Sequence, residues 1–332
     1  MPLVHCTYLV RADVLIELTY EDATSRYEYV IFADSARKAG VVQYMDNRQI
    51  YGYITFGDGQ YHVSDGIERA RALLHGAGDT PVFTGTPSPR TDTSPIYLIN
   101  LDRSTDRLAE FRKRNAHLRD VVRFPAVDGQ KLDREALVAE GVITQDCTYT
   151  LGALGCGLSH VALWKKSIDE DRPITIAEDD AIFSQQFHTH SEELTGNPSD
   201  DWDIVVWGFV FQTYVFVDIL PGVSPAKLHL FEDQLQQNIG NFQQARPLPT
   251  LMRLRHLFGT PCYSVTPKGA RALLKSCLPF DSTLVDFPGF GIITQNEGVD
   301  CAMNRAYPSL KSFVCIPPLV VVENRREASL TK

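Results

Sequence analysis

Three consecutive acids, Glu178-Asp179-Asp180, are the strongest chemical feature of the sequence. They follow the apolar run Pro173–Ala177 and precede the apolar pair Ile182-Phe183. Adjacent carboxylates repel one another, and ligands of open α/β sheets bind at the carboxyl ends of buried strands. A hard divalent cation such as Mn²⁺ or Mg²⁺ would neutralise these acids and bridge them to a nucleotide diphosphate. Because acidic triplets are also common on protein surfaces, the triplet alone fits a solvated turn equally well.

A second polar group follows the first apolar segment after residue 94. Asn100 and Asp102 stand at the end of that segment, where a carboxamide and a carboxylate can read uracil and ribose. Arg103 and Arg107 come at the start of an expected helix, where guanidinium groups meet phosphate oxygens. Surface pairing of the two arginines with Asp102 and Asp106 is the structural alternative.

Three further polar positions lie between these groups. Ser159 and His160 fall within an otherwise apolar helix, so they are either donor-site residues or polar side chains satisfied within the core. Asp128, followed by Gly129, has the composition of a plain turn. The residues alone leave the roles of all three positions open.

Several motifs occur in a fixed order along the chain. They are N-L-D-R-S-x-D-R at 100–107, F-x-A-V-D-G at 124–129, G-C-x-L-S-H-x-x-L-W at 155–164, E-D-D-A at 178–181, D-W-D-I-V at 201–205, G-T-P-C-Y-S-V-T-P-K-G at 259–269 and V-D-C-A-M-N at 299–304. This order resembles glycosyltransferase family 25, the lipooligosaccharide and procollagen galactosyltransferase group. The resemblance covers about residues 95–328, and residues 1–88 lie outside it.

The resemblance implies an inverting glycosyltransferase with a GT-A-like fold. The donor would be a metal-bound UDP-sugar, with galactose favoured, and the acceptor a hydroxyl of a saccharide or a peptide. Asp180 is the expected principal ligand of Mn²⁺ or Mg²⁺, with Glu178 as a second ligand. The residues expected at the nucleotide sugar are Asn100, Asp102, Arg103, Arg107, Asp128, Ser159, His160, Glu178 and Asp179.

An inverting transferase also needs a general base that is distinct from the metal carboxylates. Asp300 is the expected base, because the family carries an aspartate shortly after the helix that includes Gly269–Leu274. Its apolar neighbours Ala302 and Met303 would raise the pKa of a carboxylate toward the operating pH. A helix cap is the structural alternative at Asp300. Three other downstream acids remain candidates for the base: Asp281, Asp286 and Glu297.

The elements that must position these residues follow from the apolar pattern. Strands alternate with helices after residue 95, which predicts a layered α/β sheet with parallel strands. The expected strands are 96–101, 121–127, 173–177, 204–207, 262–265 and 312–322, with helices after 102, over 153–168 and from 267 to 277. Residues 219–258 lack a sustained period, so long loops or a mobile lid are expected there.

Residues 1–88 predict a small N-terminal α+β module that packs on the enzyme or docks a partner. Its expected elements are strands at 9–20, 26–32 and 50–53 and a helix at 65–74. The stretch 76–94 is dense in Gly, Pro, Ser and Thr, which is typical of a linker. We therefore expect an accessory module at 1–88, a linker at 89–94 and the transferase domain at 95–328.

Composition narrows the class of protein. The chain has 332 residues, 44% apolar and 22% charged, with a net charge of -9, which disfavours nucleic acid as a partner. Seven scattered cysteines without a C-x-x-C pair suit a reducing cytoplasm. No apolar run is long enough to span a bilayer, which leaves peripheral membrane association open. Two other functions stay in view: a glycoside hydrolase, which also needs two carboxylates, and a degenerate transferase domain that serves as a scaffold.

Overall fold

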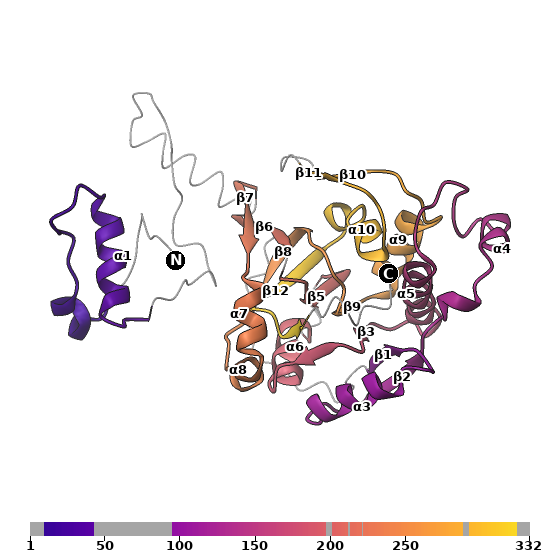
Figure 1. The fold of residues 1–332 in the computed structure, drawn as a ribbon, viewed down its shortest axis with the longest axis horizontal. Helices are drawn as coiled ribbons and strands as arrows, with labels where there is room; N and C mark the ends of the chain where they lie inside the picture. The colour runs from indigo at the N-terminus through magenta and orange to yellow at the C-terminus, as the bar shows by residue number, and fades with distance from the viewer. Residues whose placement is uncertain are drawn as a thin grey trace. The chain divides into compact units, whose positions relative to one another are not determined.

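The computed structural model describes residues 10–42, 95–196, 201–211, 213–220, 222–287 and 292–323. It divides into two compact units, Met1–Gly78 and Asp79–Lys332, and each unit is described by itself (Figure 1). The expected linker at 89–94, the strand at 50–53 and the helix at 65–74 lie outside the described residues. Within the described ranges, no helix combines the length and the apolar character that crossing a bilayer requires.

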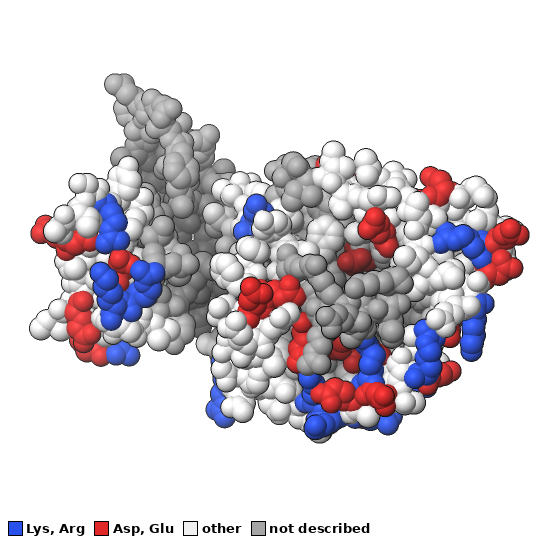
Figure 2. Space-filling view, in the orientation of Figure 1, with Lys and Arg blue, Asp and Glu red and all other residues white. Residues whose placement is uncertain are grey.

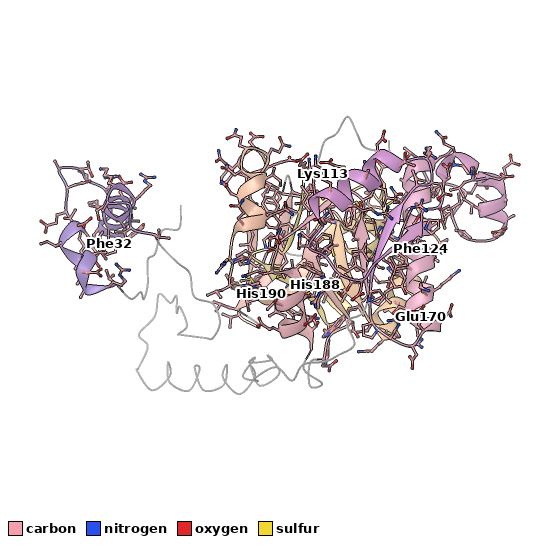
Figure 3. The ribbon with its side chains drawn as sticks, turned by 90° about the horizontal axis from the view of Figure 1, so that it is seen from below. Phe32, Lys113, Phe124, Glu170, His188 and His190 are labelled. Atoms are coloured by element: carbon pink, nitrogen blue, oxygen red, sulfur yellow. The ribbon has the colours of Figure 1, made fainter. Side chains whose placement is uncertain are left out.

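The described part of the first unit is helical, so the strands expected at 9–20 and 26–32 are wrong. A short 3₁₀ helix, η1 (Ala12–Glu17), precedes α1 (Glu28–Lys38). In α1, good helix formers follow the β-forming residues before position 33. Arg37 and Lys38 in the last turn interact favourably with the negative end of the helix dipole. Phe32 stacks on Tyr20 with ring centroids 4.4 Å apart (Figure 3).

The second unit is built on an 11-stranded mixed sheet with the order β2-β1-β3-β9-β5-β12-β8-β6-β7, extended by β13 beside β5 and β4 beside β13. A separate two-stranded sheet pairs β10 with β11. The strands are β1 (Ile96–Asn100), β2 (Val121–Pro125), β3 (Ile174–Glu178), β4 (Ala181–Phe183), β5 (Ile204–Gly208), β6 (Tyr214–Leu220), β7 (Ser224–His229), β8 (Thr250–His256), β9 (Cys262–Val265), β10 (Val285–Phe287), β11 (Ile292–Thr294), β12 (Ser312–Ile316) and β13 (Val320–Val322).

The helices of this unit lie between the strands in sequence. They are α3 (Thr105–Arg114), η3 (Gly129–Lys131), α4 (Arg134–Ala139), α5 (Leu151–Asp169), α6 (Phe187–Thr195), α7 (Glu232–Gln237), α8 (Ile239–Gln244), α9 (Pro267–Cys277), α10 (Val299–Met303) and η4 (Tyr307–Ser309). The expected start of α9 is confirmed: the Thr266 side chain caps it by accepting from the Gly269 N–H at 3.0 Å, and Pro267 takes the first helical position.

The sheet has a switch point between β1 and β3. β1 pairs in parallel with β2 on one side and with β3 on the other. The connection from β1 to β2 therefore runs toward one edge of the sheet, and the connection from β2 to β3 crosses back over β1 in the opposite direction. Ligands of open α/β sheets bind outside the carboxyl ends of the strands at such a point. The topology therefore singles out the residues that follow Asn100 and Glu178.

The expectation of parallel strands holds only in part. β5 and β12 are parallel, but β9 lies antiparallel between β3 and β5, and β6 pairs antiparallel with β8 on one side and with β7 on the other. All four residues of β9 are buried. A short strand buried on both faces shows no alternation that would reveal its direction, so the sequence pattern could not show this reversal.

Helices cover both faces of the sheet, which agrees with a GT-A-like layered fold. On one face α5, α9 and α10 pack on inward residues such as Ile99, Ile176 and Val206. On the other face α3 and α6 pack on Leu98 and Val205 through Phe111, Phe187 and Leu194. Successive residues of one strand thus enter different cores, as the two-residue period of a strand requires.

The expectation of loops or a lid at 219–258 is wrong. This segment contains the end of β6, then β7, α7, α8 and β8. In β8, Met252, Leu254 and His256 are buried while Arg253 and Arg255 between them are less so. That alternation marks a strand with one face on the core, but basic residues at every second position mask its apolar character.

Charges on the surface of this unit are mixed. Acidic and basic side chains are interspersed over the described part of the face that Figure 2 shows. Several of them pair across elements: Arg114 of α3 bonds Glu323 at 2.6 Å as well as Glu110 in its own helix. Other contacts lie within one helix: in α6, His190 Nδ1, whose residue Figure 3 labels, is 3.0 Å from a carboxylate oxygen of Glu193.

Two glycines fix α5 against the loop after β2. A Cβ on Gly155 would lie 2.6 Å from the Val127 carbonyl oxygen and 2.8 Å from the Gly129 nitrogen, and a Cβ on Gly129 would lie 2.0 Å from the Leu151 carbonyl oxygen. Real Cβ contacts are never this short, and the obstructing atoms are backbone, which cannot rotate away. The start of α5 therefore approaches the loop as closely as only glycine allows.

We predict that Gly155→Ala lowers the free energy of unfolding by about 1 to 3 kcal/mol, because overpacking forces the helix away from the loop. Gly240→Ala in α8 is the matched control, since a Cβ there meets nothing within 4 Å. It should leave stability unchanged or raise it by about 0.5 to 1 kcal/mol, the usual gain from alanine in a helix. Urea denaturation measures both, and equal effects would contradict the close-approach account.

Candidate active site at the ends of the central strands

A hollow of about 1180 Å³ opens at the carboxyl ends of β1 and β3. Its walls come from the loop after β1, the acidic triplet, the first turns of α5, the loop before β9 and the start of α10. These segments contain the motifs at 100–107, 155–164, 178–181 and 299–304, together with the first residues of the motif at 259–269. The fold thus brings together at one place the segments that carry the expected chemistry.

Asp179, the middle acid, is turned inward and fully engaged. Its side chain is 9% exposed, and its carboxylate accepts from Asn100 Nδ2 at 2.7 Å and from Arg107 Nε at 2.7 Å. A second Arg107 nitrogen donates to the same carboxylate. The three residues belong to β1, α3 and the end of β3, so this charge-assisted network ties the three elements together at the switch point.

Asn100 is held from both ends. Besides Asp179, its amide nitrogen donates to the Ser104 carbonyl at 3.1 Å, and its oxygen accepts from Arg123 Nε at 3.0 Å. Arg123 also donates to Asp102 at 2.6 Å. Asn100 is 2% exposed. The structure therefore shows it positioning the triplet, and its expected contact with the nucleotide stays a prediction, as does that of Asp102.

Glu178, the first acid, is held by the loop that precedes β9. Its Oε1 accepts from Thr260 Oγ1 at 2.8 Å, and its backbone N–H donates to the Pro261 carbonyl at 3.0 Å. The same oxygen lies 3.5 Å from His160 Nε2. Its side chain is 30% exposed, and it lines the hollow.

Asp180, the third acid, is the most exposed of the three acids that line the hollow. Its side chain is 46% exposed, and its ion pair with Arg107 is long at 3.5 Å. The pKa of Asp180 is raised, first by desolvation within the hollow and next by the negative charge of Glu178, while Arg107 opposes the shift. A carboxylate in this position gains most from a cation that enters the hollow.

The remaining residues expected at the donor have protein partners. Asp128 caps η3 by accepting from the Gln130 N–H at 3.1 Å and pairs with Arg103 at 2.5 Å. Neither arginine forms the surface pair considered from the sequence, because Arg107 binds Asp179 and Arg103 binds Asp128. Ser159 accepts from the Val127 N–H at 2.9 Å, which joins α5 to the loop after β2.

His160 is buried with 0% exposure in the middle of α5. Its Nδ1 lies 2.8 Å from the Tyr263 hydroxyl, which also accepts from Trp164 Nε1 at 2.8 Å. The core alternative considered for His160 thus describes one side of its ring. The other side, Nε2, faces Glu178.

Asp300 lines the hollow from α10. Its Oδ2 accepts from the Gly259 N–H at 3.0 Å, and its Oδ1 accepts from the Cys301 N–H at 2.9 Å. The N-cap of α10 is Gly298, so Asp300 lies in the first turn rather than at the cap position. Burial raises the pKa of Asp300, two backbone hydrogen bonds lower it, and the net shift is upward. This agrees with the environment expected of a base, although the role itself stays a prediction.

The other acids considered for the base differ in their surroundings. Asp281 forms a double ion pair with Arg305, at 2.8 and 2.6 Å, which lowers the pKa of Asp281 to about 2. Asp286 lies exposed on β10. Glu297 is exposed but does line the hollow. Of these three, Glu297 alone shares the hollow with Asp300.

Sequence reasoning missed three residues that the structure places around the triplet: Cys156, Thr260 and Tyr263. Each lies within a motif noted above, yet none was singled out. A threonine and a tyrosine next to a buried strand usually indicate nothing more than a strand end. Their partners Glu178 and His160 are about 80 and 100 positions away in the sequence, so only the fold reveals the contacts.

The chain is similar in sequence to members of a known protein family. The family model described as "Glycosyltransferase family 25 (LPS biosynthesis protein)" matches residues 93–287. A "Glycosyltransferase 25 family member" of Anopheles gambiae is 28% identical over 243 residues, which are 63% of this chain and 41% of that protein. Procollagen galactosyltransferase 2 of Homo sapiens is 28% identical over 240 residues, 63% of this chain and 38% of that protein.

A third relative, named "Probable inactive glycosyltransferase 25 family member 3", comes from Bos taurus. It is 25% identical over 325 residues, 86% of this chain and 49% of that protein. The chain therefore spans less than half the length of each of these relatives. The family model nevertheless covers more than half of the chain, including β1, α5 and the triplet that meet at the hollow, and the chain belongs to glycosyltransferase family 25.

Proposed function

We propose that this chain is an inverting glycosyltransferase that uses a metal-bound UDP-sugar as its donor and a hydroxyl of a glycan or peptide as its acceptor. The observation that supports the proposal most directly is that the three carboxylates of the triplet differ in their partners and exposure. Asp179 and Glu178 are held by the protein, whereas Asp180 is half-exposed in the hollow at the switch point.

The residues present fit a hard divalent cation. Asp180 offers carboxylate oxygen, the ligand type that Mn²⁺ and Mg²⁺ prefer, and its ion pair with Arg107 is long at 3.5 Å. Asp180 would hold the ion, with Glu178 next to it in the hollow. When bound, such an ion neutralises charge that develops on a departing diphosphate.

The protein's own residues can supply the other requirements of the reaction. Arg103 and Arg107 lie at the start of α3 and line the hollow, where guanidinium groups orient phosphate oxygens. Asp300, on the α10 side of the hollow, would accept the proton of the acceptor hydroxyl. The acceptor oxygen then forms a bond to the anomeric carbon, the bond from that carbon to the diphosphate oxygen breaks, and the electron pair leaves with UDP.

Galactose is the favoured sugar because a relative at 28% identity is named procollagen galactosyltransferase 2. Since the chain spans only 38% of that relative, the acceptor is proposed at the level of its chemistry, a hydroxyl on a saccharide or peptide. The six cysteines among the described residues are free thiols, which supports a cytoplasmic location.

A catalytically degenerate binding module is the second candidate. The relatives named inactive align over 86% of the chain, more than the 63% reached by the named galactosyltransferases. The two candidates separate in an assay of UDP-sugar hydrolysis without acceptor. Slow Mn²⁺-dependent release of UDP supports the enzyme, and its absence together with retained UDP binding supports the module.

We predict that Asp180→Asn lowers transfer by at least ~10²-fold, because the variant loses the charge that holds the donor's metal ion. Its melting temperature should not fall, since one repulsive charge is removed. Asp169→Asn, at the exposed end of α5, is the control and should keep full activity. Initial rates with Mn²⁺ and with EDTA measure the effect, and undiminished turnover in EDTA would exclude a metal-dependent mechanism.

We predict that Asp300→Asn lowers transfer by ~10²-fold or more while the affinity for UDP with Mn²⁺ stays within a few-fold of the wild type, because general-base catalysis contributes rate rather than donor binding. Asp281→Asn should retain turnover, since its carboxylate is bound by Arg305 and lies outside the hollow's lining. If Asp281→Asn loses activity and Asp300→Asn does not, the base has been assigned to the wrong aspartate.

The Asp281–Arg305 pair generates a pH prediction for stability. In the folded protein the pKa of Asp281 is about 2, below its ordinary value of 3.8. The ion pair therefore stabilises the fold above pH 3.8, and this contribution is lost as the pH falls toward 2. Asp281→Asn should cost about 2 kcal/mol or less at pH 6, and the difference from wild type should shrink below pH 4. Denaturation at pH 6, 4 and 3 measures it, and a difference independent of pH would contradict the ion-pair origin.

A further inference from the structure

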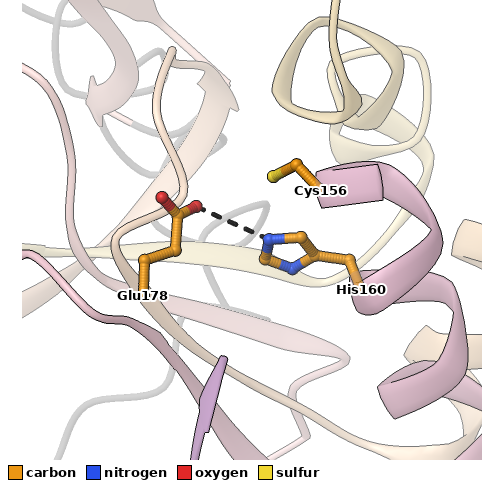
Figure 4. Close-up of side chains that lie close together, drawn as sticks. All are labelled: Cys156, His160 and Glu178. Atoms are coloured by element: carbon orange, nitrogen blue, oxygen red, sulfur yellow. Dashed lines mark ion pairs between the residues drawn. The ribbon is translucent and has the colours of Figure 1, made fainter. Parts of the chain in front are cut away.

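A thiol, an imidazole and a carboxylate converge beside the triplet. Cys156 and His160 are four positions apart on α5, so both project from the same face of the helix. Glu178 meets them from the end of β3 (Figure 4). One ligand atom from each of the three, sulfur, nitrogen and oxygen, lies within 4.8 Å of the other two.

One atom of this group is left without a partner by the protein. His160 Nε2 is buried and has no hydrogen bond. It lies 3.5 Å from Glu178 Oε1, which is longer than the 2.7 to 3.2 Å of an ordinary N–H···O bond. Buried polar atoms normally find a partner, so an orphan nitrogen aimed at a carboxylate and a thiol points to a missing ligand.

The spacing suits an ion shared by the two side chains. Bonds of about 2.0 to 2.1 Å in tetrahedral geometry place two ligand atoms of Zn²⁺ about 3.3 Å apart. The 3.5 Å between His160 Nε2 and Glu178 Oε1 is close to this separation. The carboxylate and imidazole are therefore already near the positions that a tetrahedral ion would require.

The second shell and the access route fit as well. A metal-binding histidine usually donates its other N–H to a fixed partner, and His160 Nδ1 faces the Tyr263 hydroxyl at 2.8 Å. Trp164 holds that hydroxyl from the other side. Cys156 and Glu178 line the hollow, so an ion can enter from solvent and keep water as its fourth ligand.

We propose that Cys156, His160 and Glu178 form a binding site for a soft divalent cation, with Zn²⁺ the best match to a sulfur, nitrogen and oxygen ligand set. The site shares Glu178 with the hard-cation site proposed at Asp180, but Cys156 and His160 belong to it alone, and binding of the ion does not depend on sugar transfer. On binding, the Cys156 thiol releases its proton to solvent and bonds the ion as a thiolate. His160 presents the Nε2 lone pair to the ion, so its proton sits on Nδ1, and this N–H donates a hydrogen bond to the Tyr263 oxygen.

The test uses the full chain, stripped of metal and titrated with Zn²⁺ by calorimetry and with Co²⁺ by absorption spectroscopy. The expected result is one tight equivalent of Zn²⁺ and, with Co²⁺, a thiolate-to-cobalt charge-transfer band with the d–d absorption of tetrahedral geometry. Cys156→Ser should abolish the charge-transfer band. Tyr263→Phe removes a partner of His160 rather than a ligand, so it should lower the affinity for Zn²⁺ by ~10- to 100-fold. Cys156→Ser should lower that affinity by more.

Two variants serve as controls. Cys301 is a second partly buried thiol that lines the same hollow, so Cys301→Ser should leave the band and the affinity unchanged. Asp180→Asn should also keep the site, which separates this proposal from the proposed transferase activity. A charge-transfer band that persists in Cys156→Ser would overturn the assignment. So would tight Zn²⁺ binding that is lost in Asp180→Asn but retained in folded Cys156→Ser or His160→Gln.

Discussion

Three carboxylates in succession at the end of a buried strand repel one another, and each must be compensated or left facing a cation. The protein resolves this constraint in three different ways. Arg107 and Asn100 neutralise and bind Asp179, and Thr260 binds Glu178. Among the described residues, Asp180 has one ion pair, the 3.5 Å contact with Arg107, and its side chain lines the open hollow. This unequal compensation is the reason why Asp180 is the proposed ligand of the donor's metal ion.

The architecture around the triplet follows from this constraint. Arg107 can reach Asp179 because α3 begins directly after β1, which is the parallel neighbour of β3. The loop before β9 can reach Glu178 because β9 also pairs with β3, and Gly259 in that loop is tied to Asp300. Cores on both faces of the sheet hold these strand ends in place. The loop before β9 thus contacts both Glu178, which is next to the proposed metal ligand in the triplet, and the proposed base Asp300.

Much of the fold was predictable from local signals. Short apolar runs identified β1 and β3, the Thr-Pro pair identified the start of α9, and the apolar stripe of α5 identified the longest described helix. The failures have separate physical causes. In β8 arginines at alternate positions mask the buried face, in α1 β-forming residues precede the helix formers, and the antiparallel direction of β9 leaves no trace in four fully buried residues.

The site was predictable in its residue types but not in its partners. The motifs named Asn100, Arg107 and Asp179, yet their mutual contact joins positions more than 70 residues apart. Arg103 pairs with Asp128 in the loop after β2, and not with Asp102 or Asp106, the structural alternative considered from the sequence. Local sequence limits which side chains are available, and the switch-point topology decides which of them meet.

The central claim is that Asp180 holds the donor's metal ion. The most direct measurement is anomalous diffraction from crystals grown with Mn²⁺ and UDP. A manganese peak at direct coordination distance from the Asp180 carboxylate, with Asp179 still bound to Arg107 and Asn100, is the predicted result. A peak coordinated by Asp179, with the Arg107 pair broken, or UDP bound in the hollow without any manganese peak, would contradict it.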